Sequence, residues 1–341
     1  MVSRIDNPET VSENTLLSAL GSQGLPTIQF SKPGQSKALL KSINALCKVF
    51  GKKLPIRFYA HYQDDFDASV LEHLPDVQWL LVDCLQQISN SEKLFELPKL
   101  KKLSFGVYNY DTRDFLNKLD IDKLEQLSIG ETKKRNFDLS PLREGNQIRS
   151  LSVAGHDKNI DVISDMESLE TLNLHFIGKR TSLEFVSSIA KLRALKITLG
   201  GRQNIDEIKH PLLKELEIIR IRGFNDLGDL SRFPHLKRLH IADQIKVLSI
   251  SLQNPYLNEL KILNCKALNE LNGLEALKNI NHVRCYKTSL DYENLSQLNW
   301  AKSLKILALY SGNNKSDEAL RRQLDSRGFK EFSKTLEERN L

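Results

Sequence analysis

The sequence has 341 residues, a formal net charge of +6 and four cysteines. No apolar run approaches the roughly 18 residues that cross a membrane, and the start lacks the basic and then apolar regions of a secretion signal. The cysteines form no CxxC pair, which is typical of reduced thiols rather than of disulfides or a zinc site. We therefore expect a cytoplasmic protein that neither spans nor binds a membrane.

Residues 1–53 are expected to form an N-terminal helical cap, because a stack of repeats exposes an apolar edge at each end. The capping box that runs from Thr10 to Glu13 predicts a short helix over about 11–20. Residues 25–30 have apolar side chains at their first, fourth and sixth positions and are expected to form an edge strand. Apolar residues at steps of three and four predict an amphipathic helix over 36–50.

A six-residue pattern with apolar side chains at positions 1, 4 and 6 recurs through residues 54–312. A degenerate copy begins at Leu54, and the eleven clear copies begin at Val77, Leu100, Leu124, Ile148, Leu169, Leu192, Leu213, Leu236, Leu257, Ile280 and Leu304. These eleven starts lie 21–24 residues apart, within the period of about 20–29 residues that defines leucine-rich repeats. Each copy predicts one strand of a parallel sheet, with positions 1, 4 and 6 in a shared core and positions 3, 5 and 7 on an open, concave face.

The segments between the strands predict an irregular convex side. Residues 183–190 and 274–278 have apolar residues at helical spacing, and shorter segments predict 3₁₀ turns. Residues 245–250 repeat the strand pattern too soon for another repeat, so we expect an extended convex strand there.

Residues 313–341 are expected to form a C-terminal helical cap. Its helix is predicted to begin at Ser316 as N-cap, to bury Leu320 and Leu324, and to end at Gly328. Phe329, Phe332 and Leu336 are expected to continue this cap.

The pattern from about Leu54 to Leu309 resembles the leucine-rich repeat family, in its irregular intracellular type. Within that type the chain resembles the leucine-rich regulatory subunit of protein phosphatase-1 and related bacterial repeat proteins. The resemblance implies an α/β solenoid, or horseshoe, with a parallel concave sheet, helical, 3₁₀ or extended convex segments, and helical terminal caps. Family members typically place Asn or Cys three residues after position 6. This chain has no Asn at that site, so we expect the polar ladder of the family to be mostly missing.

The open face is expected to change character along the chain. Ser104, Ser128 and Ser152 occupy position 5 of three consecutive repeats and predict a shallow polar trough. The trough is expected to be bordered by Trp79 on one side and by His175 and Phe176 on the other. Further along the chain, large and charged side chains predict a second contact area at Arg238, His240, Lys261, His282, Arg284, Tyr286 and Tyr310. Aromatic and arginine side chains are favoured anchors at protein interfaces.

No sequence motif for catalysis, phosphate binding or metal binding is present, so we expect neither an enzyme nor a cofactor. The leading hypothesis is a protein-binding module that grips another protein on its concave face. A regulatory subunit, an effector and a toxin-neutralising immunity protein stay open alternatives, and the sequence leaves the oligomeric state open. The second hypothesis is an RNA or polyanion binder that uses a basic margin at position 2, although Glu215, Glu217 and Glu259 make nucleic acid a poor match for the face itself. The margin residues are Lys101, Arg149, Arg193, Lys214, Lys237 and Lys305.

Overall fold

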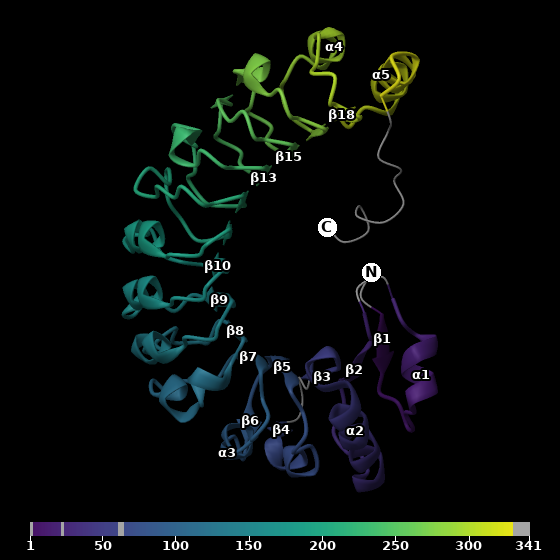
Figure 1. The fold of residues 1–341 in the computed structure, drawn as a ribbon, viewed down its shortest axis with the longest axis vertical. Coiled ribbons are helices and arrows are strands. Elements are labelled where there is room, and N and C mark those ends of the chain that lie inside the picture. Colours follow the sequence, from purple (N-terminus) through teal and green to yellow (C-terminus); the bar gives the residue numbers. More distant parts are fainter. Residues whose placement is uncertain (1–2, 22–23, 61–64, 330–341) are drawn as a thin grey trace. The chain divides into compact units, whose positions relative to one another are not determined.

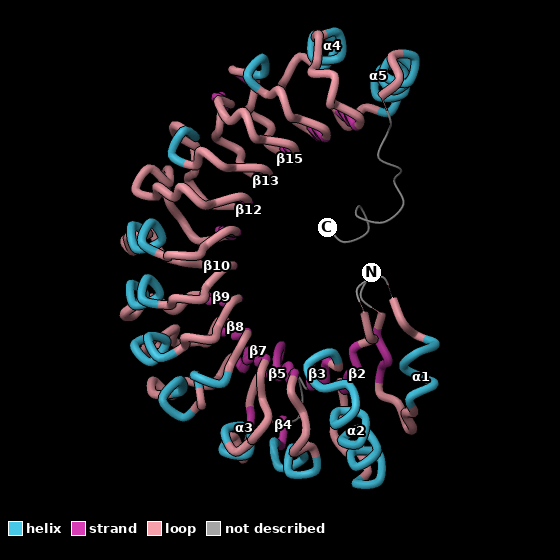
Figure 2. The backbone as a smooth tube through the Cα atoms, viewed as in Figure 1, coloured by secondary structure: helices cyan, strands magenta, loops and turns pink. Residues whose placement is uncertain are grey.

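The computed structural model describes residues 3–21, 24–60 and 65–329, and the chain divides into two compact units, residues 1–169 and 170–341. Within each unit the strands line one side, and helices and turns line the other (Figures 1 and 2). The expected continuation of the C-terminal cap through Phe332 and Leu336 lies outside the described residues. The division into caps and a repeat body over 1–53, 54–312 and 313–341 stays a prediction.

The N-terminal unit contains a parallel sheet with the strand order β1-β2-β3-β5-β7-β8-β9. Its strands are β1 (Arg4–Asp6), β2 (Thr27–Phe30), β3 (Pro55–Tyr59), β5 (Trp79–Leu85), β7 (Lys102–Val107), β8 (Gln126–Ile129) and β9 (Ser150–Ala154). On the other side lie a two-stranded sheet and helices, namely β4 (Phe66–Asp67), β6 (Ile88–Ser89), α1 (Glu13–Ser18), α2 (Lys37–Phe50) and α3 (Glu92–Phe95). Turns of 3₁₀ helix cover Gly51–Lys53, Ala68–His73, Phe115–Lys118, Ile121–Lys123, Ser140–Glu144 and Ile160–Asp165.

The unit of residues 170–341 repeats this plan. Its parallel strands are, in spatial order, β10 (Thr171–His175), β11 (Ala194–Thr198), β12 (Glu215–Ile219), β13 (Arg238–Ala242), β15 (Glu259–Leu263), β17 (His282–Tyr286) and β18 (Ile306–Tyr310). The other side carries β14 (Ser249–Ser251) paired with β16 (Glu270–Asn272), the helices α4 (Tyr292–Gln297) and α5 (Asn314–Ser326), and 3₁₀ turns at Glu184–Ser188, Leu230–Arg232 and Leu274–Ala276.

The repeat register is confirmed. Leu169, Leu172 and Leu174, at positions 1, 4 and 6, are fully buried, whereas Asn173 between them is partly exposed. The same alternation of buried and partly exposed side chains marks β8 to β12. Because neighbouring strands pair in register, each repeat adds its apolar side chains to one continuous core within its unit.

The chain turns at position 8, directly after the strand, and this turn was not predicted. The residue at this position adopts a left-handed backbone at Cys84, Gly155, Phe176, Leu199, Arg220, Asp243, Asn264 and Lys287. In residues 170–341 its N–H donates to the position-7 carbonyl of the next strand, as from Leu199 to Ile219 at 2.9 Å and from Asp243 to Leu263 at 2.9 Å. This turn aims the position-9 side chain into the core.

Polar side chains at position 9 bond backbone carbonyls in three repeats, at His156, Gln244 and Cys265. The Gln244 amide donates to the carbonyls of Ala242 at 3.0 Å and Ile218 at 3.4 Å. The Cys265 thiol lies 3.5 Å from the Leu263 carbonyl, and His156 Nε2 lies 3.1 Å from the Gly130 carbonyl. Histidine and glutamine thus bond backbone carbonyls at the site where family members typically place Asn or Cys, and Cys265 follows the family pattern.

The cap elements differ from prediction in their ends. The N-cap of α1 is Ser12 rather than Thr10, because the Ser12 hydroxyl accepts the N–H of Thr15. The predicted helix over 36–50 is confirmed as α2, with Ser36 as its N-cap. The sheet edge is β1 and not residues 25–30, because Arg4–Asp6 pairs in parallel with the strand that those residues form.

At the other end, the N-cap of α5 is Asn313 rather than Ser316, because the Asn313 amide oxygen accepts the N–H of Lys315. Leu324 is buried and Leu320 only partly so.

The convex strand near residue 250 is shorter than predicted and has another register. It covers Ser249–Ser251 and buries Val247 and Ile250, while Ile245 and Leu248 are exposed.

Candidate protein-binding surface

The outward side chains of β10 to β18 form three rows across the sheet, which we call the open strand face. The pairing register aligns position 3 of every strand, then position 5, then position 7. The position-5 row is Asn173, Lys196, Glu217, His240, Lys261, Arg284 and Ala308. The position-3 row includes Glu215, Arg238, Glu259 and His282. Charges of opposite sign therefore lie side by side.

These charges neutralise one another within the face. Lys196 pairs with Glu217 at 3.0 Å, and Lys261 pairs with Glu259 at 2.8 Å. Arg238 pairs with Glu215. Exposed pairs of this kind add little stability, but they leave little net charge on the face. A phosphate backbone needs a basic surface, so this face is a poor match for nucleic acid.

The position-7 row, in contrast, is mostly uncharged and ends in two aromatic residues. It consists of His175, Thr198, Ile219, Ala242, Leu263, Tyr286 and Tyr310. Burial, followed by the nearby Lys196 charge, lowers the pKa of His175, so this imidazole is neutral at pH 7. His175, Tyr286 and Tyr310 were predicted contact residues, whereas Ile219 and Leu263 were not, because they become part of a row only when the strands are aligned.

Two predicted contact residues are less accessible than strand alternation implied. His282 and Arg284 point outward in register, yet they are 8% and 9% exposed. Phe176 is not a strand residue of the face, because it occupies the left-handed turn after β10. The predicted second contact area nevertheless lies together, since Arg238, His240, Lys261, Tyr286 and Tyr310 come from β13, β15, β17 and β18, which follow one another in the sheet.

The three serines of the predicted trough lie in one row within residues 1–169, and the trough itself stays a prediction. Ser104, Ser128 and Ser152 are paired directly across β7, β8 and β9, and Leu81 of β5 continues their row. Gly130 allows the backbone after β8 to lie close to β7, because a Cβ atom there would lie 2.7 Å from the Cα atom of Gly106. Trp79 lies on β5, the strand next to β7. The other predicted border, His175 and Phe176, stays a prediction.

Metal ligands and cysteine thiols are the other candidate features. No group of three or more His, Cys, Asp or Glu side chains is placed to hold a metal ion in the described part of the chain. Cys47, Cys265 and Cys285 are buried free thiols, and burial raises their pKa to about 12, 11 and 12. Among the described helices, none is long and apolar enough to cross a membrane.

No protein-family model matches the sequence, and a search of curated proteins finds no match. Several solved structures are similar. An internalin, InlF, from Listeria monocytogenes is 19% identical with a TM-score of 0.49, over 84% of this chain and 78% of that chain. The leucine-rich repeat domain of APL1 is 14% identical with a TM-score of 0.46, over 86% and 89%. A leucine-rich repeat protein from Leptospira interrogans is 15% identical with a TM-score of 0.41, over 97% and 95%.

Because these identities and TM-scores are low, the fold is assigned from the chain itself. Its repeat period, its one parallel strand per repeat and the turn at position 8 all follow from its own residues and register. The resemblance to the leucine-rich regulatory subunit of protein phosphatase-1 is not shown and stays a hypothesis. The chain is a leucine-rich repeat solenoid.

Proposed function

We propose that this chain is a non-enzymatic binding module that grips another protein across its open strand face. The position-7 row supports this proposal most directly, because most of its apolar and aromatic side chains are only partly buried, namely Ile219, Leu263, Tyr286 and Tyr310. A strip of such side chains beside internally neutralised charges has the composition of a protein interface, with an apolar centre and a polar rim.

We further propose a cytoplasmic location, which the four free cysteines support. A regulatory subunit, an effector and an immunity protein that neutralises a toxin all fit such a module. Cross-linking in native lysate, with the cross-links mapped to Lys196 and Lys261 of the face, would identify the partner.

The second candidate function is binding of RNA or another polyanion along the basic margin. Arg149, Arg193, Lys237 and Lys305 of this margin are exposed. Phosphate contacts weaken steeply as salt rises, so retention on heparin or RNA at about 0.2 M salt would favour this function. Loss of retention at that salt would favour the protein-binding proposal.

Replacing both Tyr286 and Tyr310 with alanine is expected to weaken binding of the identified partner at least tenfold, equivalent to about 1.4 kcal/mol. The two tyrosines are paired across β17 and β18 and are only partly buried. We therefore expect the melting temperature to change little. Titration calorimetry with the purified partner measures the effect.

The matched control is Tyr256→Ala, because Tyr256 is an exposed tyrosine in a turn outside the sheet rows. Equal affinity of the double variant and the control would show that the tyrosine pair is not a contact.

The trough gives a separate prediction. Ser128→Arg places a long charged side chain in the middle of the serine row and is expected to reduce partner affinity at least tenfold by steric exclusion. Ser42→Arg on the exposed face of α2 makes the same chemical change away from the trough and is expected to have no effect. If both variants bind as tightly as the unmodified chain, the partner does not enter the trough.

A further inference from the structure

The strand face of residues 1–169 contains a hollow that the predicted contact residues touch only at Trp79. The hollow has a volume of about 710 Å³ and lies over β1, β2, β3, β5 and β7. Its floor is a single row of residues aligned by strand pairing, namely Arg4, Thr27, Pro55, Trp79 and Lys102. A cation therefore stands at each end of the row, with proline and tryptophan between.

Polar side chains next to the floor bond one another. The Arg57 guanidinium pairs with Asp83 at 2.7 Å and lies 4.5 Å from the centre of the Tyr59 ring. The side chain of Gln29 is buried and donates to the Tyr59 hydroxyl at 3.2 Å. These polar groups satisfy one another. Asp83 therefore neutralises the charge of Arg57 within the protein. Arg57 is thus not a free cation for a bound ligand.

Three of the four other cations around the hollow form no ion pair with the described residues. Lys52 pairs with Glu125 at 2.7 Å, but among the described residues Arg4, Lys53 and Lys102 form no ion pair. The Lys102 ammonium lies 4.3 Å from the centre of the Trp79 ring. Leu81 and the exposed Leu20 add apolar surface to the lining. The hollow thus combines an apolar centre with an excess of positive charge at its ends.

We propose that this hollow binds an extended acidic segment of a partner protein, with an apolar side chain on Trp79 and a carboxylate near each end of the row. Arg4 and Lys102 lie on strands that are four steps apart, which is about 19 Å at about 4.8 Å per step. An extended chain rises about 3.3 Å per residue, so the two carboxylates should be about six residues apart. The inference rests on the proposed protein-binding function and specifies the chemistry of one contact.

Selection from a displayed library of random ten-residue peptides on the full chain tests the proposal. Enriched peptides are expected to contain two acidic residues five to seven positions apart, with a Leu, Phe or Trp between them. Fluorescence anisotropy then measures one enriched peptide. Lys53→Glu/Lys102→Glu is expected to weaken its binding at least tenfold, because it reverses two of the unpaired charges.

The control is Lys37→Glu/Lys41→Glu, which makes the same charge change on exposed positions of α2 and is expected to alter affinity less than twofold. Arg4→Glu, at an exposed edge position, is a second test whose result does not depend on how the double variant folds. Enrichment of neutral or basic peptides, or equal binding by all variants, would overturn the proposal. Tight binding of a 15-nucleotide uridine RNA that the same variants abolish would also overturn it, because the hollow would then take a polyanion.

The tyrosine experiment separates this inference from the proposed function. If Tyr286→Ala/Tyr310→Ala loses the native partner while the hollow selects no acidic peptide, the binding module stands and the hollow does not.

Discussion

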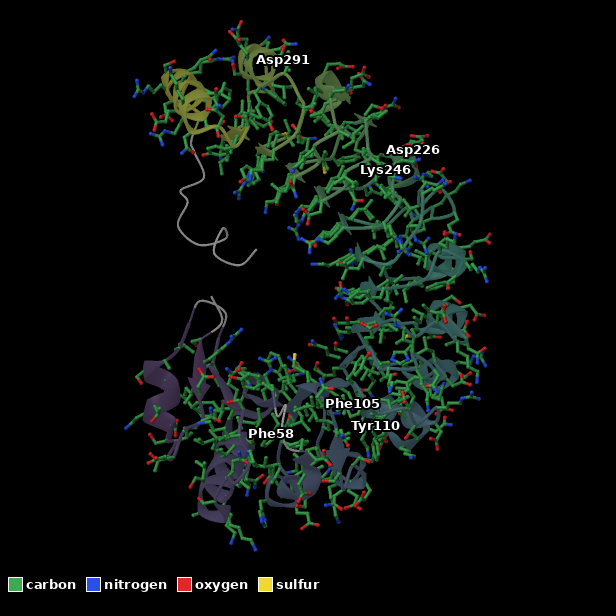
Figure 3. The ribbon with its side chains drawn as sticks, turned by 180° about the vertical axis from the view of Figure 1, so that it is seen from behind. Phe58, Phe105, Tyr110, Asp226, Lys246 and Asp291 are labelled. Carbon is green, nitrogen blue, oxygen red and sulfur yellow. The ribbon has the colours of Figure 1, made fainter. Side chains whose placement is uncertain are left out.

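Phe115→Ala is expected to lower the free energy of unfolding by about 3–5 kcal/mol, the range for removing a large aromatic side chain from a packed core. Phe115 is fully buried, and its ring stacks between Phe105 at 4.3 Å and Phe137 at 4.9 Å between ring centres. The Tyr110 ring contacts the Phe115 ring edge-on, with 5.7 Å between ring centres. Phe105 and Tyr110 are labelled in Figure 3. Because Phe137 belongs to the repeat after that of Phe115, the cavity would loosen two repeats at once.

Urea denaturation followed by circular dichroism measures this effect. Tyr108→Ala is the control, since Tyr108 lies in the same repeat and is 45% exposed. We expect it to cost well under 1 kcal/mol. If both variants lost the same stability, the aromatic stack would not be a principal part of the core.

The strands were predictable because one physical rule governs them. Side chains alternate between core and surface, so apolar residues at positions 4 and 6 identify both the strand and its buried face, as at Leu172 and Leu174. The period then orders the strands. The same reasoning placed Ser104, Ser128 and Ser152 in one row.

Other features left no such signature in the sequence. The left-handed turn at position 8 is occupied by residues as different as Phe176, Leu199 and Asp243, so composition does not mark it. The left-handed conformation goes with the hydrogen bond to the next strand and not with the conformational preference of the residue itself. The aromatic stack joins Phe115 and Phe137 from segments outside the strands, where neither helical nor strand spacing applies.

The candidate site shows the same limit. The alternation of strand side chains predicts that Arg284 points away from the core. It does not predict that Arg284 is only 9% exposed, because exposure depends on the surrounding side chains. The hollow over β1 to β7 depends on pairing between Arg4 and Thr27, and the three-residue strand β1 was not predicted.

His156 is expected to make stability depend on pH between 6.5 and about 4. It is fully buried at position 9, and its ring stacks on Phe137 with 4.3 Å between ring centres. Burial, opposed by the hydrogen bond to the Gly130 carbonyl, lowers the pKa of His156 to about 4. Nδ1 accepts the N–H of Phe137 at 3.1 Å, so a proton on that nitrogen would break this bond.

The direction of the effect follows from proton binding. The unfolded chain takes up a proton near pH 6.5, whereas the folded chain stays neutral at this histidine until about pH 4. The contribution of neutral His156 is therefore complete above pH 6.5 and is lost as the pH falls to about 4. At about 1.4 kcal/mol per unit, the loss amounts to about 3 kcal/mol. Urea denaturation at pH 7, 5.5 and 4 should show it for the unmodified chain.

Carboxylates also titrate in this pH range. The prediction is therefore tested by comparing the loss of unfolding free energy between the unmodified chain and variants. His156→Gln keeps a polar group for the Gly130 carbonyl but cannot take up a proton, and its stability should fall by about 3 kcal/mol less over the same interval. His235→Gln removes an exposed histidine and should follow the unmodified chain. If His156→Gln and the unmodified chain lost the same stability between pH 7 and 4, the buried imidazole would not be held neutral. Position 9 would then tolerate a charged side chain in the core.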